Sequence, residues 1–481
     1  MTETEKRRQS GSAAATLTAI FVAQFLVSLD VSLVNIALPN IAEDLGFSGT
    51  GLQWVVSAYL LTFAGFMLLG GRLGDLWGRR RVVEVGLALF ALASILGGLA
   101  WDAQSLVLAR ALQGVAGALL APAALALVTS LPEGTQRRRG MALWGGAGAG
   151  GGAVGVVLSG LLTEAYGWRA VMLINVPIVL VGFVAATRMM GSALSRSDRP
   201  NLDPIGALLA TSGVGILVYA VTSSGESGWV SVPVVLGCTV ALLLLSSFVF
   251  LESRVNNPLM PLRLFDSRSM VGANLFGFML SAGQLAAFYF ASLHIQNVWG
   301  VSAGIAGFMF VPFCVFVGVG IALATKSTAA VGPRITLALF GVIGAVGLAG
   351  FAAMPDATAF WTGVFIPSIF GGIGIGGSMI ALGSAATAGV ASADAGIASG
   401  VLNASRLLGG TVGLAVLVTI AASVTENSTA GSAAAAAGDG YRIGLGVGAV
   451  FLLVGSVLAY VIVPKGAMTA STDVDGAVPD N

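Results

Sequence analysis

Charge is scarce in this sequence of 481 residues: only 9% are Asp, Glu, Lys or Arg, whereas 56% are hydrophobic. A soluble globular protein carries roughly 25% charged residues. A chain with so little charge cannot cover its whole surface with polar groups, so lipid must be its solvent over much of that surface. The formal net charge of +1 gives no indication of a nucleic-acid partner.

Cysteine and histidine are almost absent, since Cys238, Cys314 and His294 are the only ones in the chain. Two cysteines inside apolar runs exclude a disulfide framework and a cysteine metal cluster. A single histidine leaves almost no material for a histidine metal site or a catalytic triad. We therefore expect no metal, no cofactor and no enzymatic reaction.

Long apolar runs fill most of the chain. A helix rises about 1.5 Å per residue, so about 20 residues cross the hydrocarbon core of a bilayer. Runs of this length without two-residue alternation predict helices and not the strands of a barrel. The sequence predicts an all-α integral membrane protein with fourteen spans, near residues 14–38, 52–71, 82–100, 105–129, 140–163, 169–189, 203–222, 231–251, 270–293, 303–324, 333–354, 359–383, 397–423 and 441–463.

The basic residues predict the orientation of these spans. With the N-terminus in the cytoplasm, Arg169 and Arg442 are outside, Arg110 and Arg406 lie within spans, and all the others of the 23 lysines and arginines are inside. Cytoplasmic loops of membrane proteins carry such an excess. Both termini are therefore expected in the cytoplasm. We also expect a structureless loop at 424–440 and a disordered tail after Pro464.

Two opposite charges lie inside the first and fourth spans. Asp30 is about 12 Å, and Arg110 about 9 Å, from the outer end of its span, so the two are expected at similar depth. Each costs about 2.5–3.5 kcal/mol near the bilayer centre, which pairing or a wet cavity would offset. Either Asp30 binds a proton or a cationic substrate beside Arg110, or the two form a static ion pair that holds the helices together.

Other polar residues of the spans are weaker candidates. Arg406 has no partner nearby in the sequence. It either faces a cavity or pairs with backbone carbonyls. Asn35 and Gln113 are candidate substrate contacts, although a buried amide more often makes a hydrogen bond between helices.

Two glycine-rich segments are also candidates. The segment 71–81 predicts a tight turn after span two. Its acidic residue, Asp75, either caps a helix or pairs with a basic group, and either contact could hold one conformation closed on the inside. Anchoring of the arginines to anionic lipid is the alternative interpretation. The candidate residues of this segment are Gly71, Gly74, Asp75, Gly78, Arg79 and Arg80. The segment 145–155 lacks the Lys-Ser/Thr of a phosphate-binding loop, so its glycines predict close helix packing.

These segments together resemble a known family. Leu29-Asp30 to Pro39, the 71–81 turn, Arg110-Ala111-Leu112-Gln113-Gly114 and Gly396–Arg406 are similar to motifs of the drug–proton antiporters of the major facilitator superfamily, in its fourteen-span branch. The resemblance implies proton coupling through Arg110 and alternating access between two six-helix bundles. It divides the chain into a cytoplasmic N-terminus (1–13), a bundle (14–189), a two-helix insert (190–269), a second bundle (270–463) and a tail (464–481).

The resemblance also assigns Gly151, Gly155 and Gly160 to the antiporter motif of span five. That motif normally has a Gly-Pro pair, where this chain has Gly155-Val156. Antiport and symport therefore stay open. The function expected is proton-driven export of hydrophobic or amphipathic drugs or antibiotics from a bacterial cell by a monomer in the plasma membrane. Transport of another metabolite is the alternative.

Overall fold

The computed structural model describes residues 3–48, 51–132, 134–189, 203–255, 262–390 and 395–465, and these are helical throughout apart from turns and short loops. Eleven of the described helices are long and apolar enough to cross a membrane. Two shorter apolar helices, 51–67 and 205–221, and the turn that divides the 50-residue segment 303–352 bring the apolar segments to fourteen.

The N-terminal half packs around helix α1. It comprises α1 (Glu3–Leu45), η1 (Gly51–Gln53), α2 (Trp54–Trp77), α3 (Arg79–Gly98), α4 (Ala103–Thr129), α5 (Thr135–Tyr166), α6 (Trp168–Leu173) and α7 (Asn175–Arg188). α1 packs against α5, α4 and α7, while α2 packs against α4. Asp102 caps α4: its carboxylate accepts a hydrogen bond from the Ser105 backbone N–H, and hydrogen bonding to the side chain and the backbone of Ser105 lowers the pKa of the Asp102 carboxyl.

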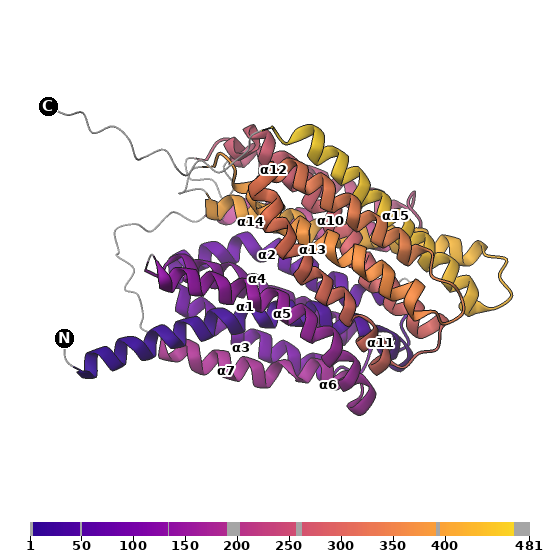
Figure 1. Cartoon of the computed structure of the whole chain (residues 1–481), viewed down its shortest axis with the longest axis horizontal. Helices are drawn as coiled ribbons and strands as arrows, with labels where there is room; N and C mark the ends of the chain where they lie inside the picture. The colour runs from indigo at the N-terminus through magenta and orange to yellow at the C-terminus, as the bar shows by residue number, and fades with distance from the viewer. Residues whose placement is uncertain are drawn as a thin grey trace.

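The C-terminal half is a second helical bundle, drawn in orange and yellow in Figure 1. α10 packs against α14 and α15, and α12 packs against α13 and α15. Its elements are η3 (Leu262–Asp266), α10 (Arg268–Leu293), η4 (His294–Val298), α11 (Ala303–Met309), α12 (Val311–Ala352), η5 (Phe360–Phe365), α13 (Ile366–Thr387), α14 (Ala395–Asn427) and α15 (Ala433–Ile462).

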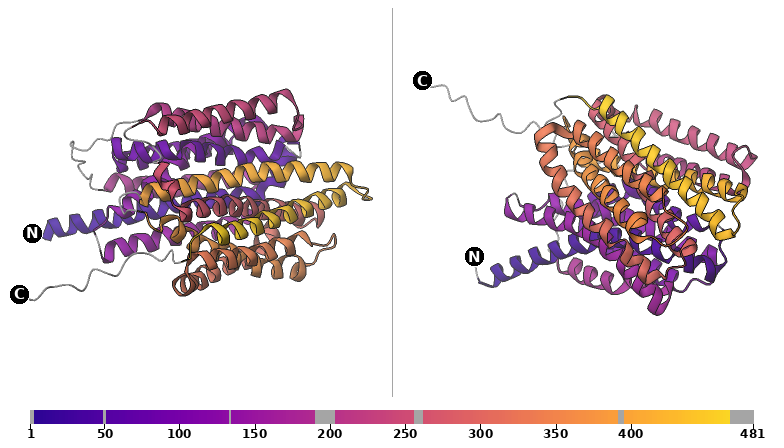
Figure 2. Two further views of the ribbon diagram at one scale, coloured as in Figure 1. Left: turned by 90° about the horizontal axis from the view of Figure 1, so that it is seen from above. Right: turned by 45° about the vertical axis from the view of Figure 1, so that its right-hand side comes forward.

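A pair of helices joins the two halves along the chain. α8 (Pro204–Ser227) and α9 (Val232–Glu252) pack against each other, and α8 also contacts α2 of the first half and α14 of the second. The pair lies along one edge of the molecule, drawn in magenta in the left view of Figure 2. On α9, Leu242, Leu243 and Phe250 are all more than 60% exposed, as expected of a face that meets lipid.

The start of α1 and the end of α15 lie at the same end of the molecule (Figure 1). We call this the near end, and the opposite one the far end. An even number of crossings places the two ends of the chain together in this way. Residues 466–481, and with them the predicted disordered tail, lie outside the described part of the chain.

Single glycines reverse the chain at the near end. Gly78, between α2 and α3, has φ 91° and ψ 135°, and Gly332, inside α12, has φ 80° and ψ 166°. Only glycine adopts this backbone conformation readily. The expectation that Gly71 and Gly74 belong to the turn is wrong, because α2 continues through both to Trp77. The helix does not end where its apolar run ends, since its backbone hydrogen bonds form equally well beyond the hydrocarbon.

The predicted loop at 424–440 is wrong for most of its length. α14 continues to Asn427 and α15 begins at Ala433, which leaves only 428–432 between them. The five consecutive alanines from Ala433 favour a helix, and the Ser432 hydroxyl accepts a hydrogen bond from the Ala435 backbone N–H to cap it.

Candidate functional site: a buried charge network and the contacts between the halves

Asp30 and Arg110 meet inside the N-terminal half. Arg110 Nη1 lies 2.5 Å from Asp30 Oδ2, and both side chains are buried, with exposed fractions of 1% and 0%. Asp30 lies about two-thirds of the way along α1 and Arg110 about one-third of the way along α4, two helices that pack together. The sequence placed the two residues at similar depth, and the structure pairs them in a site that water does not reach in this conformation.

Polar groups from other helices surround this pair. Arg110 Nη1 also donates to Gln113 Oε1 (2.8 Å), and Arg110 Nε donates to the Val55 carbonyl (2.9 Å). Asp30 Oδ1 accepts from Asn175 Nδ2 at 3.0 Å and from Gln113 Nε2 at 3.4 Å.

The same network reaches two further side chains. Gln113 Nε2 donates to Ser94 Oγ at 2.9 Å, and the Arg110 guanidinium lies 4.5 Å from the centre of the Tyr59 ring. This distance is within the range of a cation–π contact. The Tyr59 hydroxyl is buried and has no hydrogen-bond partner among the residues that the structure describes. Five helices, α1, α2, α3, α4 and α7, thus contribute to one charge network.

A carboxylate in such a network can take up a proton if its ion pair opens. The pair compensates two charges that lipid and protein would otherwise leave unsolvated, and removing one partner of a buried pair is strongly unfavourable. Proton binding at Asp30 therefore requires Arg110 to find another partner, or water to enter. A change in the protonation of Asp30 would therefore change the contact between α1 and α4.

Arg406 is not part of this network. It lies on α14 in the C-terminal half, half-buried, and its Nε atom is buried without a hydrogen-bond partner. No ion pair or hydrogen bond joins it to any residue that the structure describes. The predicted alternative, pairing with backbone carbonyls, is not observed.

Asn35 lies apart from Asp30, in the contact between the two halves. Its amide Nδ2 donates to the Val31 carbonyl of its own helix (2.8 Å), and its backbone carbonyl accepts from the Ser292 hydroxyl of α10 (3.1 Å). Gln296 Nε2 donates to the Ile36 carbonyl (3.0 Å) and to Ser292 Oγ (2.9 Å). These bonds hold α1 and α10 together in the far part of the molecule.

The glycines predicted on α5 make two different contacts. A Cβ added to Gly151 would lie 2.7 Å from the Phe25 carbonyl oxygen, and one added to Gly155 would lie 2.8 Å from that of Leu29. These two glycines, four residues apart, let α5 approach α1 closely. Gly160 faces the other half, where an added Cβ would lie 2.5 Å from the Ala303 carbonyl oxygen.

Gly160 belongs to the contact between the two halves at the far end, which we call the far-end junction. Ser302, just before α11, donates to Glu164 Oε2 of α5 at 3.2 Å. Among the described residues, every direct hydrogen bond between α1–α7 and α10–α15 lies in this far part of the molecule. The two halves are therefore joined at the far end.

At the near end, arginines after the Gly78 turn bind neighbouring helices. Arg79 Nη1 donates to the Ala126 carbonyl at the end of α4 (2.7 Å). Arg80 donates to Glu84 (2.8 Å) and to the Met189 carbonyl after α7 (2.8 Å). The side chain of Asp75 lies outside the described residues, so its predicted cap or pair is not observed here.

The two arginines predicted outside the membrane both lie at the far end, and both have acidic partners. Arg169 Nη1 is 2.5 Å from Asp44 Oδ2. Arg442 pairs with Asp356 (2.8 Å) and Asp439 (2.5 Å). Both arginines at the far end are thus paired with acidic residues.

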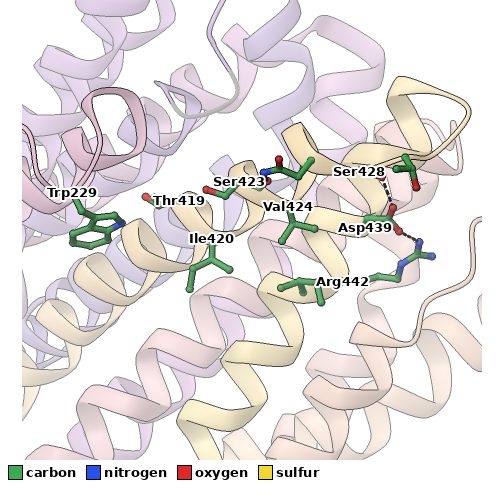
Figure 3. Close-up of a pocket in the computed structure, with 11 residues that line it drawn as sticks. Trp229, Thr419, Ile420, Ser423, Val424, Ser428, Asp439 and Arg442 are labelled. Carbon is green, nitrogen blue, oxygen red and sulfur yellow. Dashed lines mark hydrogen bonds and ion pairs between the residues drawn. The ribbon is translucent and has the colours of Figure 1, made fainter.

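A groove of about 750 Å³ also opens at the far end, where Trp229 of the α8–α9 turn faces α14 and α15 (Figure 3). It is lined by Trp229, Thr419, Ser423, Asn427, Asp439 and Arg442, among others. No residue of the charge network lines it. In the described part of the chain, no three histidine, cysteine or acidic side chains come close enough to hold a metal ion.

The comparison with known proteins now decides the family. Residues 20–414 match the family model of the Major Facilitator Superfamily. The chain belongs to this superfamily. The match covers α1 to the middle of α14 and includes every element of the charge network.

Relatives in the superfamily cover nearly the whole chain. The Cephamycin export protein CmcT of Amycolatopsis lactamdurans is 39% identical over 466 residues, which are 96% of this chain and 94% of the relative. The Puromycin resistance protein pur8 of Streptomyces alboniger is 37% identical, over 93% of this chain and 90% of the relative. The Multidrug resistance protein Stp of Mycobacterium tuberculosis is 32% identical, over 85% and 75%.

Solved structures share the fold. A bacterial homologue of the human lysosomal transporter Spinster superposes with a TM-score of 0.70, at 13% identity, over 96% of this chain and 99% of its own. The chain is thus a multi-pass membrane transporter with the fold of the Major Facilitator Superfamily, as the sequence predicted.

Three residues of the charge network in this superfamily member were not predicted from the sequence as site residues: Tyr59, Ser94 and Asn175. Asn175 could have been found as a polar residue in an apolar span. Ser94 and Tyr59 carry no such signal, because serine and tyrosine are ordinary in membrane helices. Only the packing of α2, α3 and α7 around Arg110 identifies them.

Proposed function

We propose that this protein exports amphipathic drugs or antibiotics across the bacterial plasma membrane in exchange for protons, and so confers resistance. The buried Asp30–Arg110 pair is the observation that carries the proton-coupled part of this proposal, since an ionisable pair at lipid depth marks an ion pathway. Support for the cargo comes from relatives named for the export of, or resistance to, cephamycin, puromycin and several drugs.

The proposed cycle uses the two halves as its moving parts. The excess of arginine supports an orientation with the near end and both termini in the cytoplasm. In that orientation, the far-end bonds of Asn35, Ile36 and Glu164 to the C-terminal half would close the outer side, which supports an inward-facing conformation. Proton binding at Asp30 would loosen its pair with Arg110, and a rearrangement of α1 and α4 would then act on the α1–α10 junction. One chain supplies both halves, so a monomer suffices.

The available driving force is sufficient for resistance. A proton-motive force of about 150 mV supplies about 3.5 kcal/mol per proton, which corresponds to a concentration ratio of about 300-fold. Export against such a ratio keeps the cytoplasmic concentration of a drug far below the external one.

Everted membrane vesicles test the proposal. In vesicles that respiration has acidified inside, addition of puromycin, a cephamycin, lincomycin or ethidium should release protons, measured as recovery of a quenched pH-sensitive dye, and the drug should accumulate. A symporter would instead let drug and protons leave together, without accumulation. If no compound of the panel accumulates or releases protons, while the protein is present in the membrane, the proposal is wrong.

The same panel has a cellular counterpart. Expression of the chain in an efflux-deficient host should raise the inhibitory concentration of the compounds that accumulate in vesicles. A host that becomes more sensitive to them would indicate uptake.

A further inference from the structure

Arg406 has no acidic ion-pair partner among the residues that the structure describes. It lies eleven residues, about 16 Å, from the start of α14, and so well inside the bundle. Its stem packs on α10, where a Cβ added to Gly277 would lie 3.1 Å from Arg406 Cγ. Its Nε atom is buried without a hydrogen-bond partner, while the side chain as a whole is partly accessible. The guanidinium therefore borders an open space.

The helices around Arg406 cannot supply a carboxylate at this depth. α10, α12 and α13 contain no Asp or Glu at all. The acidic residues of α14 and α15 are Glu426 and Asp439, both in the far part of the molecule. α2 and α8, which also pack against α14, carry their acidic residues only within three positions of a helix end.

The one carboxylate at the centre of the N-terminal half is already used. Asp30 is held by Arg110, Asn175 and Gln113. The pair of Asp30 and Arg110 sums to zero charge, so the middle of the described bundle carries one uncompensated positive charge, on Arg406. An unpaired charge away from water is unfavourable, and a charge-assisted bond to a carboxylate relieves it.

The two amide side chains of α10, Asn274 and Gln284, make no hydrogen bond to Arg406. The Asn274 amide binds its own neighbours: its Nδ2 donates to the Met270 carbonyl (2.8 Å), and its Oδ1 accepts from the Ser405 hydroxyl (2.7 Å). Gln284, which shares a face of α10 with Gly277 at helical spacing, is half-buried and makes no hydrogen bond to the described residues. Neither amide of α10 therefore binds the Arg406 guanidinium in the described part of the chain.

We propose that Arg406 binds an acidic group of the exported compound, so that the protein prefers amphipathic substrates bearing a carboxylate over their uncharged or esterified forms. The proposal rests on the proposed export function and adds to it the charge of the cargo. The guanidinium donates two parallel hydrogen bonds to the carboxylate of the compound. Asp30 keeps its separate role with the proton.

Matched pairs of fluorescent compounds test this preference. The pairs are rhodamine B with its ethyl ester and dansyl-phenylalanine with its methyl ester, so each pair differs only in one carboxylate. Uptake is measured in everted vesicles that contain the full chain, as the part of the initial rate that a protonophore abolishes. The wild-type protein should transport the acid of each pair several-fold faster than its ester.

The variants separate ligand binding from structure. Arg406→Gln should lower uptake of both acids at least tenfold and leave uptake of the esters unchanged, which also shows that the variant is folded. Arg406→Lys should keep part of the preference, because it keeps the charge but loses the planar fork of donors. Equal loss of acid and ester transport in Arg406→Gln would overturn the proposal, as that result describes a structural residue.

Two possible results with the wild-type protein would also overturn the proposal. Faster transport of the esters overturns the proposal, and so does failure to move either acid by a protein that moves ethidium. Both leave proton-coupled export intact, because proton release with ethidium or with an ester measures that function by itself. Loss of proton-coupled transport for every probe would instead overturn the proposed function.

Discussion

Replacing Asp30 with asparagine separates the structural role of the charge network from its coupling role. The substitution keeps the shape of the side chain and removes its charge, which leaves Arg110, 1% exposed, without a counter-ion. The amide that replaces the carboxylate also presents an N–H₂ group to donors on Arg110, Gln113 and Asn175. Removing one partner of a buried ion pair costs about 3–5 kcal/mol. We expect Asp30→Asn to lose stability within that range.

The double variant Asp30→Asn, Arg110→Gln is the matched control. It removes both charges, so no buried charge of this pair is left without a counter-ion. Because the two residues are in contact, their effects should be strongly non-additive. The double variant should therefore unfold at a temperature close to that of the wild type, whereas the single variant unfolds several degrees earlier.

The two variants should differ in stability but not in proton-coupled transport. Both variants lack the proton-binding carboxylate, so both should fail to release protons from acidified everted vesicles when a substrate is added. Thermal unfolding in detergent and proton release in vesicles are measured on the same preparations. A double variant that regains both stability and proton release would refute the assignment of coupling to Asp30 and leave the pair as a packing element. Wild-type proton release by Asp30→Asn alone would refute it as well.

Three further substitutions follow from the structure. Gly78→Ala should lower the free energy of unfolding by about 1–3 kcal/mol, because φ 91° is strained for alanine, whereas Gly74→Ala, inside α2 with no atom within 4 Å of the added Cβ, should be neutral or stabilising in the same thermal unfolding assay. Gly160→Ala should weaken the far-end junction and increase hydrogen exchange in α11, since its Cβ would lie 2.5 Å from the Ala303 carbonyl oxygen; Gly150→Ala on the same helix, with no atom within 4 Å, should change neither exchange nor transport. Arg169→Gln should cost less than about 1 kcal/mol, because its pair with Asp44 is nearly half exposed, and a larger loss in denaturant unfolding would show that the pair anchors the far end.

The fold of this protein follows closely from local properties of the chain. The length of each apolar run, the shortage of charge and the distribution of arginine depend only on the solvent that each segment meets. They predicted the helical class, the number of spans and the shared end for both termini. Even the depth of Asp30 and Arg110 follows from counting residues along two helices, because the rise per residue is constant.

What depends on contacts between distant segments could not be read in this way. Sequence alone left open whether Asp30 pairs with Arg110, placed Asn35 with the candidate site although it lies at the junction of the halves, and left the partner of Arg406 undecided. It also treated Gly71, Gly74 and Gly78 alike, although two lie within a helix and one reverses the chain. Tertiary structure decided these points because a polar group in lipid must find its partner on another helix, and the rotation and crossing of helices determine which groups meet. The chain's local chemistry thus determined a helical membrane transporter, and packing alone determined which of its charges are paired and which has no counter-charge among the described residues.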